Sequence, residues 1–374
     1  MARRSEKAAE LVAILGAFSF LLSAIEYAFP KPLPFMRLGV ANLPLLLAID
    51  LLPFPSYMIL AIVKIVGMSL VSGTLFSYVA IFSALGSLAS ALVMWATRRA
   101  GRGAVSHLGV SVTGAMASSA AQILLARALI FGQAAWYVAP LFLATSLVTG
   151  TALGLFADRF AKRSRWYALR LPGEGTGARP DLGQAEGPEK AEGPEKAEGP
   201  EQAEGPEQAD PPPKSKPLPA SKAALTRRRR AEVWEARFDP GALAISGALV
   251  ASTLFFQPDL GLKALLVALL ALATGLSGRR ISVVAALLVS ASIIGANLAI
   301  PVGRVLARFG PLVISETALL EGLSKALVFQ GLIYASKASI RVGLRLPGKL
   351  GALVSEAFVT YEGLIEGGLP LRPG

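Results

Sequence analysis

Five polar residues in the N-terminal half have types and positions suited to lining a binding pocket. Glu26 and Arg37 flank a proline-rich stretch, and Asn42 follows within EYAFPKPLPFMRLGVAN. Lys64 and Gln122 lie near the middle of apolar runs. Polar groups within hydrocarbon are costly and usually face a partner or a cavity. The sequence therefore predicts a substrate-binding pocket formed by these five residues, in which Arg37 could receive an anionic group in a bidentate manner.

These residues also have plainer interpretations. Glu26 and Arg37 could form an interfacial ion pair that only fixes the loop between them. Lys64 could extend along the helix so that its ammonium group reaches the membrane surface. In the second half of the chain, Glu321 and Lys325 are four residues apart, which is the spacing of an ordinary ion pair on one helix face. The sequence leaves these alternatives open.

Residue types exclude several classes of chemistry. The chain has no cysteine, which excludes disulfides, thiolate metal sites and cysteine nucleophiles. Its one histidine, His107, lies among basic residues between two apolar runs, so we expect a solvated loop residue. There is no GxxxxGK[ST] motif for ATP and no paired aspartate cluster that would hold Mg²⁺ on a diphosphate. We therefore expect no catalytic residues, no metal and no cofactor, and no enzyme activity of the chain itself.

Composition places the chain in a lipid bilayer. Of 374 residues, 53% are hydrophobic and 17% are charged, and the mean hydropathy is +0.55. Soluble domains carry about 25% charged residues. Apolar runs recur at lengths that cross roughly 30 Å of hydrocarbon, where only helices satisfy their own backbone groups. The net charge of +12 comes from basic residues that flank these runs, which favours anionic lipid headgroups over nucleic acid as the partner.

The pattern predicts an all-α polytopic membrane protein in three parts. Residues 1–170 should form a six-span membrane domain. Residues 171–237 contain AEGPEK and AEGPEQ repeats and should form a disordered cytoplasmic linker that ends in a basic cluster. Residues 238–374 should form a second membrane domain with about four further spans and a cytoplasmic amphipathic helix. The expected spans are 8–29, 38–52, 56–71, 75–96, 108–130, 136–156, 242–256, 260–276, 281–300 and 318–335.

The second expected span is short and bounded by Pro53 and Pro55, so we expect that it does not cross alone. Lys and Arg are concentrated in alternate connections, including 98–107 and 159–170, which the positive-inside rule assigns to the cytoplasm. The connections at 30–37 and 71–74 are then outside. This distribution predicts that both termini and the linker lie in the cytoplasm.

The stretches PKPLPFMRLGVAN, SGTLFS and GAMASSAAQ resemble a family of bacterial membrane proteins called heptaprenyl diphosphate synthase component I, or Gx transporter. The resemblance covers about residues 8–160 and implies location in the bacterial inner membrane. This family is similar to the S components of energy-coupling factor (ECF) transporters, six-helix bundles that capture a vitamin-like molecule from outside. The positions that match its motifs are Glu26, Pro34, Arg37, Gly39, Asn42, Lys64, Gly73, Thr74 and Gln122. Lys64 replaces an expected arginine, and Ser118 and Ser119 replace a pair that is often His-Asn.

The resemblance also implies docking surfaces. Ala9, Ala13 and Ala17 form a small-xxx-small pattern that lets another helix approach closely, as in S components that dock a transmembrane T component. Residues from about 238 to 366 resemble, more faintly, the T component itself. Its coupling helix would correspond to IRVGLRLPGKLGALVSEAF, with Arg341, Arg345 and Glu356 as coupling residues. The Ala-Arg-Gly motif that grips ATPase subunits is not evident, which leaves coupling to ATP hydrolysis in doubt.

Three functions follow as hypotheses. The first is a transport protein in which an S-like module is fused to a T-like module and moves a small solute, with ECF ATPase subunits as expected partners. The second is a non-catalytic membrane accessory subunit of heptaprenyl diphosphate synthesis. The third is a membrane component that passes electrons between quinone and extracytoplasmic flavoproteins.

Overall fold

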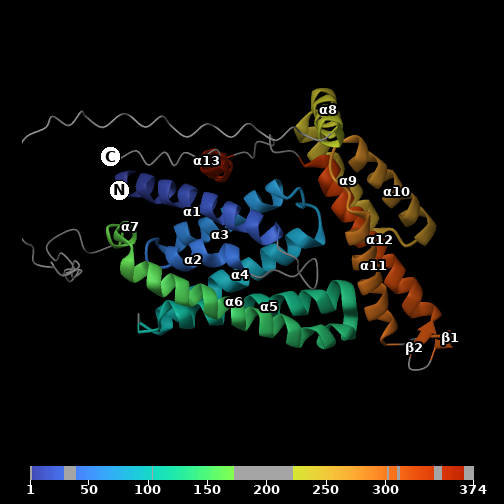
Figure 1. Ribbon diagram of the computed structural model, residues 1–374, viewed down its shortest axis with the longest axis horizontal. Coiled ribbons are helices and arrows are strands. Elements are labelled where there is room, and N and C mark those ends of the chain that lie inside the picture. The colour runs from blue at the N-terminus through green and yellow to red at the C-terminus, as the bar shows by residue number, and fades with distance from the viewer. Residues whose placement is uncertain are drawn as a thin grey trace, which may run out of the picture.

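The computed structural model describes residues 2–28, 39–102, 104–171, 222–300, 303–309, 312–340 and 348–365. Within these ranges the chain is an all-α polytopic membrane protein, as predicted, with one two-stranded hairpin. We call α1–α7 the N-terminal bundle and α9–α12 the C-terminal block (Figure 1). The bundle helices are α1 (Ala2–Ala28), α2 (Leu43–Ala48), α3 (Phe54–Val71), α4 (Tyr78–Ala100), α5 (His107–Ala126), α6 (Ala135–Arg163) and α7 (Arg165–Ala168).

Short connecting helices and caps set these boundaries. A 3₁₀ turn, η1 (Val40–Asn42), precedes α2 and begins at Gly39, whose φ of +85° suits glycine. Pro53 and Pro55 flank the start of α3, where proline is tolerated because the first N–H groups of a helix have no partner within it. A π-helical segment, η2 (Arg127–Phe131), and a 3₁₀ turn, η3 (Gly132–Ala134), connect α5 to α6. At six residues, α2 is too short to cross a bilayer, in agreement with the sequence.

The rest of the described chain consists of six helices and the hairpin. The helices are α8 (Lys222–Arg237), α9 (Pro240–Phe256), α10 (Leu260–Leu276), α11 (Val283–Leu298), α12 (Glu316–Ser339) and α13 (Gly348–Ile365). The antiparallel strands are β1 (Val305–Phe309) and β2 (Leu312–Ser315). Val305, Val313 and Ile314 in these strands are β-branched residues, a type that favours strands.

The predicted linker lies partly outside the described residues, which do not include 172–221. Its last part differs from the expected disordered segment, because 222–237 form α8. The Arg, Ala and Glu residues there are good helix formers. The ring of Trp234 also packs against Phe238, with centroids 4.8 Å apart.

Five stretches of the described chain are long and apolar enough to cross a bilayer, or six if the bent α8–α9 pair counts as one span. They are 6–26, 54–71, 78–100, 107–163 and 316–339. Fewer stretches pass this test than the ten expected spans because α5 and α6 fall in one stretch, and because four helices are too short. These are α2 with six residues, α9 and α10 with 17 each, and α11 with 16. Several apolar helices nevertheless place the chain among membrane proteins.

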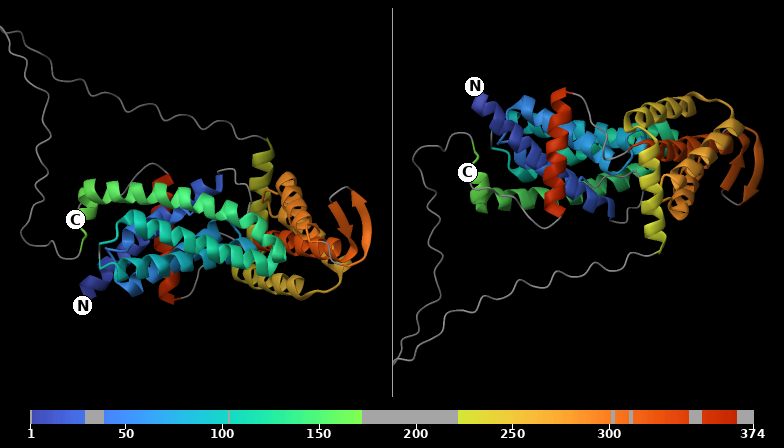
Figure 2. Two further views of the ribbon diagram at one scale, coloured as in Figure 1. Left: turned by 90° about the horizontal axis from the view of Figure 1, so that it is seen from below. Right: turned by 90° about the horizontal axis from the view of Figure 1, so that it is seen from above.

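The C-terminal block lies across one end of the N-terminal bundle (Figures 1 and 2). At the end of α11, Asn297 Nδ2 donates to Ile130 O in the α5–α6 connection over 3.2 Å. In the α3–α4 connection, Phe76 N donates to Ser336 Oγ over 3.2 Å. Asn297 packs beside Gly322 of α12, so the first contact lies next to Gly322 and the second lies at Ser336. These two positions are roughly 21 Å apart along the axis of α12. Both connections belong to the same end of the bundle, so α12 crosses the bundle helices.

This arrangement differs from the sides of the membrane that the distribution of Lys and Arg predicted for two of the connections. The turn at 71–74 was assigned to the outside, and the same rule assigns the basic residues from Lys337 onward to the cytoplasm, but Gly73 packs against Lys337. The positive-inside rule considers each apolar run against the membrane and not the packing of one block on another. An apolar interface holds the two blocks together here, including Tyr78 and Phe329, whose ring centroids are 5.8 Å apart.

Helix α13 crosses α1 on the side of the bundle (Figure 2). A Cβ built on Gly16 would lie 3.3 Å from Ala357 Cβ, so the two helices approach closely at small residues. The ring of Phe20 also contacts Phe358 and Tyr361, with centroids 5.1 and 6.1 Å away. This contact joins the end of the chain to its first helix.

Candidate functional site

A buried polar cavity lies inside the N-terminal bundle, among α1, η1, α3, α4 and α5. Four of the five predicted pocket residues line it, namely Glu26, Asn42, Lys64 and Gln122. They come from segments up to 96 positions apart, and helix packing brings them together. Arg37, the fifth, lies outside the described residues.

Lys64 contributes a charged side chain to this cavity. Its side chain extends from the middle of α3 and the residue is only 3% exposed. The ammonium group donates a hydrogen bond to Ser87 Oγ on α4 over 3.0 Å and another to Asn42 Oδ1. A buried ammonium group needs such partners, because burial without them is very costly. Lys64 therefore points between helices rather than along α3 to the surface.

Glu26 connects the end of α1 to the short turn before α2. It is 2% exposed, and its Oε2 accepts a hydrogen bond from Ala41 N over 3.4 Å. Asn42, one residue further on, donates through Nδ2 to Ser90 Oγ on α4 over 3.5 Å. The positive φ of Gly39 lets the chain turn so that this segment faces the cavity. The carboxylate, the amide and the ammonium group thus meet in one polar region.

The wall on α5 is formed by Gln122 and Ser118. Gln122 Nε2 donates to Ser118 Oγ over 3.0 Å, and Gly86 on α4 lies directly opposite them. The next residue, Ser119, bonds to the Ser146 hydroxyl and to Phe142 O on α6. The two serines at the expected His-Asn positions therefore have different roles, since only Ser118 lines the cavity.

The cavity is narrow. Its free space is about 20 Å³, which is enough for about one water molecule. A second cavity of similar size shares Gly39, Asn42 and Ser118 with it and extends toward α6. A solute larger than water needs more space than the described residues leave in these two cavities.

The predicted docking and coupling residues are only partly described. Ala13 and Ala17 are buried and Ala9 is half-buried, and Gly16 of the same helix packs against Ala357 of α13. Glu356 is exposed on α13. Arg341 and Arg345 lie outside the described residues.

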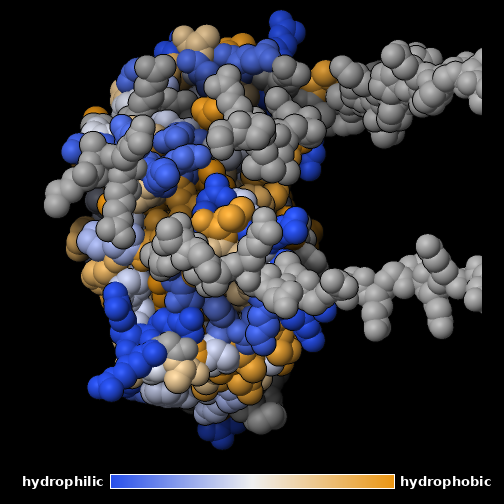
Figure 3. Space-filling view, turned by 90° about the vertical axis from the view of Figure 1, so that its left-hand side faces the viewer, coloured by the Kyte–Doolittle hydropathy of each residue, from blue (hydrophilic) through white to orange (hydrophobic). Residues whose placement is uncertain are grey.

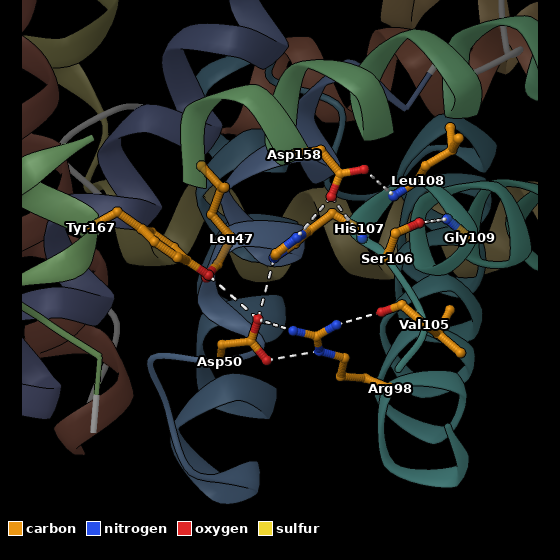
Figure 4. Close-up of polar contacts among 10 residues, drawn as sticks. All are labelled: Leu47, Asp50, Arg98, Val105, Ser106, His107, Leu108, Gly109, Asp158 and Tyr167. Carbon is orange, nitrogen blue, oxygen red and sulfur yellow. Dashed lines mark hydrogen bonds and ion pairs between the residues drawn. The ribbon is translucent and has the colours of Figure 1, made fainter. Parts of the chain in front are cut away.

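A second polar cluster, which the sequence did not predict, lies at the end of the bundle that carries α7, away from the C-terminal block (Figure 1). Figure 4 shows its contacts. Asp50 forms a bidentate pair with Arg98, with Oδ1–Nε and Oδ2–Nη2 distances of 2.9 and 2.8 Å. His107 lies between two carboxylates, with its Nε2 3.2 Å from Asp50 and its Nδ1 3.1 Å from Asp158. Tyr167 OH donates to Leu47 O over 3.3 Å, at the edge of the cluster.

His107 is therefore not the solvated loop residue that we expected. It is 8% exposed and begins α5, where Asp158 accepts hydrogen bonds from the backbone N–H groups of His107 and Leu108. Burial alone would raise the pKa of Asp50, but hydrogen bonds from His107 and Arg98 outweigh it and hold the pKa below the usual 3.8. The only sequence signal for this polar cluster was the presence of Asp50 and Asp158 in a domain with few carboxylates.

This end of the bundle also carries exposed charge. Arg99, Arg102, Lys162 and Arg163 are exposed near the ends of α4 and α6. Hydrophilic side chains are prominent on the face that carries α7, beside hydrophobic ones (Figure 3). The half-buried ion pairs thus lie beneath a polar end face, and the polar cavity around Lys64 lies deeper in the bundle.

Fold and site together define an all-α polytopic membrane protein with charged residues buried inside its N-terminal bundle. Residues 15–160 match the family model described as heptaprenyl diphosphate synthase component I. The resemblance expected from the sequence is thereby confirmed. Residues 242–342 match a model described as a domain of unknown function (DUF8519), which leaves the T-like assignment a prediction. Searches of the curated proteins and of the solved structures give no match.

Proposed function

We propose that this chain binds a small polar solute in the cavity around Lys64 and moves it across the membrane. The observation that carries the proposal is the convergence of Glu26, Asn42, Lys64 and Gln122 in one buried site. Ionisable groups inside a membrane protein mark substrate or ion pathways by default, because burying them has no structural benefit. A carboxylate, an ammonium group and two amides suit a solute that carries both donors and acceptors.

The crossing of the two blocks supports the proposal that the solute is moved across the membrane. If α12 runs across the bilayer, the N-terminal bundle that it crosses lies at a steep angle to the membrane normal. The cavity would then face a different direction after the bundle turns relative to the C-terminal block. In this proposal the bundle is an S-like binding module and residues 238–374 are a T-like module, with α13 as the docking element on α1.

Location and partners are part of the same proposal. The exposed basic residues at the ends of α4 and α6 support a cytoplasmic position for that end, in the inner membrane of a bacterium. The start of α1 lies at that end and would be cytoplasmic with it, whereas α8, the last part of the linker, packs at the other end of the bundle (Figure 1). ECF ATPase subunits are the proposed energy source, and the exposed face of α13 around Glu356 is available to them.

The test is native mass spectrometry of the chain purified in detergent from its own host. We expect a co-purifying small molecule that is lost in Lys64→Met. The matched control is Lys263→Met, because Lys263 is also buried and donates to a serine, Ser324 Oγ, over 2.6 Å, but in the C-terminal block. A wild-type chain that carries no small molecule, or a loss that is equal in both variants, would contradict the proposal.

A second candidate function rests on the family description. That description names a component of a prenyl diphosphate synthase, so the chain could instead be a non-catalytic accessory subunit that holds such an enzyme at the membrane. The test is synthase activity in membranes from cells with and without this chain. Full activity and normal membrane attachment of the synthase in its absence would exclude this function.

A further inference from the structure

A larger cavity of about 480 Å³ lies where the two blocks meet, apart from the polar cavity around Lys64. Its walls come from α1, α3, α8, the α10–α11 turn and the end of α12. This volume is within the range of sites that bind small molecules, roughly 300–1,000 Å³. We call it the junction cavity.

One wall of the junction cavity is basic. It is formed by Arg227 of α8, Arg279 and Arg280 of the α10–α11 turn, and Lys337 of α12. No carboxylate is among the described residues that line the cavity. Four cations gathered in one partly buried space repel one another, and a bound anion would relieve that repulsion.

Two of these cations donate to backbone carbonyls and keep further donors available. Arg279 Nη2 donates to Ile340 O over 3.2 Å, but its Nε is buried without a hydrogen-bond partner. Lys337 Nζ donates to Arg280 O over 3.3 Å, which leaves further ammonium protons. Gly278 has a φ of +75°, and a Cβ there would meet Arg227 O at 2.4 Å, so α8 is packed tightly onto this turn.

The opposite wall is apolar. Phe20 and Ala24 of α1 and Met68 and Val71 of α3 line it, with the hydroxyls of Ser23 and Ser72 beside them. A ligand that fits both walls has an anionic head and an apolar chain. Guanidinium groups bind phosphate oxygens in a bidentate manner, which makes phosphate the anion that best suits an arginine-rich wall.

We propose that the junction cavity binds a phosphate-bearing amphiphile, with the head on Arg227, Arg279, Arg280 and Lys337 and the apolar chain along α1 and α3. The four cations favour a head with two or more negative charges. Because the ligand contacts both blocks, it stabilises the crossed arrangement described above. This site is independent of the solute cavity, although Met68 lines both.

The experiment uses the full chain in neutral detergent and follows binding by native mass spectrometry. The probes are dioleoyl phosphatidic acid, farnesyl diphosphate, inorganic pyrophosphate and the neutral lipid dioleoyl phosphatidylcholine. The variant is Arg280→Gln, whose exposed side chain is not required for packing, and the control is Arg308→Gln, which removes an exposed charge from β1. Thermal melting of each variant confirms that it is folded.

We expect at least one of the two phosphate amphiphiles to bind, at least about tenfold more weakly in Arg280→Gln but unchanged in Arg308→Gln. Preference for phosphatidic acid identifies a membrane lipid as the source, and preference for farnesyl diphosphate identifies a prenyl phosphate. Pyrophosphate binding as tight as that of the amphiphiles would overturn the role of the apolar wall. Equal binding of phosphatidylcholine, or no effect of Arg280→Gln, would overturn the proposal as a whole.

Discussion

Lys64 Nζ, buried in the middle of α3, donates a hydrogen bond to Ser87 Oγ of α4 over 3.0 Å. This bond places a positive charge between two helices of the bundle, at a depth where charge is otherwise avoided. The arrangement has a cost in stability that a purely structural role does not explain well, because an apolar side chain of similar size would pack there without desolvation.

The first prediction concerns this charge. Lys64→Met should weaken binding of the co-purifying solute at least about tenfold, or about 1.4 kcal/mol, while the chain stays folded. Lys64→Arg should retain more binding than Lys64→Met, because the positive charge is kept. Titration of solute-free protein with the identified solute measures both effects. Unchanged affinity in Lys64→Met would show that the buried lysine is structural.

The second prediction concerns the size of the solute cavity. A methyl group at Gly86 would lie 2.8 Å from Ser118 Oγ and 3.1 Å from Gln122 Nε2. Gly86→Ala should therefore displace both side chains, abolish solute binding and cost about 1–3 kcal/mol of stability from overpacking. Thermal melting and the same binding assay measure the two effects.

Its control is Gly275→Ala in α10, where a Cβ would meet no atom within 4 Å. That substitution should leave solute binding unchanged and leave stability equal or slightly higher, because alanine is the better helix former. If Gly86→Ala bound solute normally, the residues around Gly86 would not form the binding site.

Much of the fold and of this site could be predicted from residue types. Apolar run lengths identified the helices, and the cost of polar groups in hydrocarbon selected Glu26, Asn42, Lys64 and Gln122, which the structure brings together. The crossing of the two blocks could not be predicted, because it depends on contacts such as Asn297 with Ile130 across 167 positions. Local sequence patterns carry no information on such pairings.

His107 shows a second limit. Its basic neighbours indicate a solvated loop, but Asp50 and Asp158, 57 and 51 positions away, fold against it. The junction cavity was missed for a similar reason. Each of its cations has an ordinary explanation as a charge that flanks an apolar run, and only the packing of α8 and α12 shows that they share one space.

The third prediction concerns Asp50 and pH. The pKa of Asp50 is lower in the folded chain than its usual 3.8, so the ionised carboxylate stabilises the fold above that pH. This contribution is lost as the pH falls through the lowered pKa and the carboxylate takes up a proton. Asp50→Asn should lower the free energy of unfolding by about 1–3 kcal/mol at pH 7.

The measurement is thermal melting in detergent between pH 3 and 7. The gap in melting temperature between the wild type and Asp50→Asn should begin to narrow below about pH 4, because the unfolded chain then takes up a proton at Asp50 before the folded chain does. Asp239→Asn is the control, because Asp239 is an exposed helix cap whose role asparagine can take over. A gap that stayed constant down to pH 3 would rule out the carboxylate charge as its cause.

The fourth prediction concerns the contact of α13 with α1. The wild-type chain has no cysteine, so an introduced pair is free of competing thiols. At Gly16 and Ala357 the Cβ positions would be 3.3 Å apart, close to the roughly 3.5–4.5 Å of a disulfide. Gly16→Cys with Ala357→Cys should form an intramolecular disulfide on mild oxidation, detected as a mobility shift that a reductant reverses.

This cross-link also tests whether the contact between α13 and α1 is permanent or opens during transport. If the bundle turns relative to the C-terminal block during transport, locking α13 onto α1 should stop solute uptake into vesicles, and reduction should restore it. The control pair moves one partner to the exposed Glu356, as Gly16→Cys with Glu356→Cys, and should cross-link much less. Full uptake by the oxidised Gly16–Ala357 pair would show that the contact is fixed and that transport, if it occurs, does not require this interface to open.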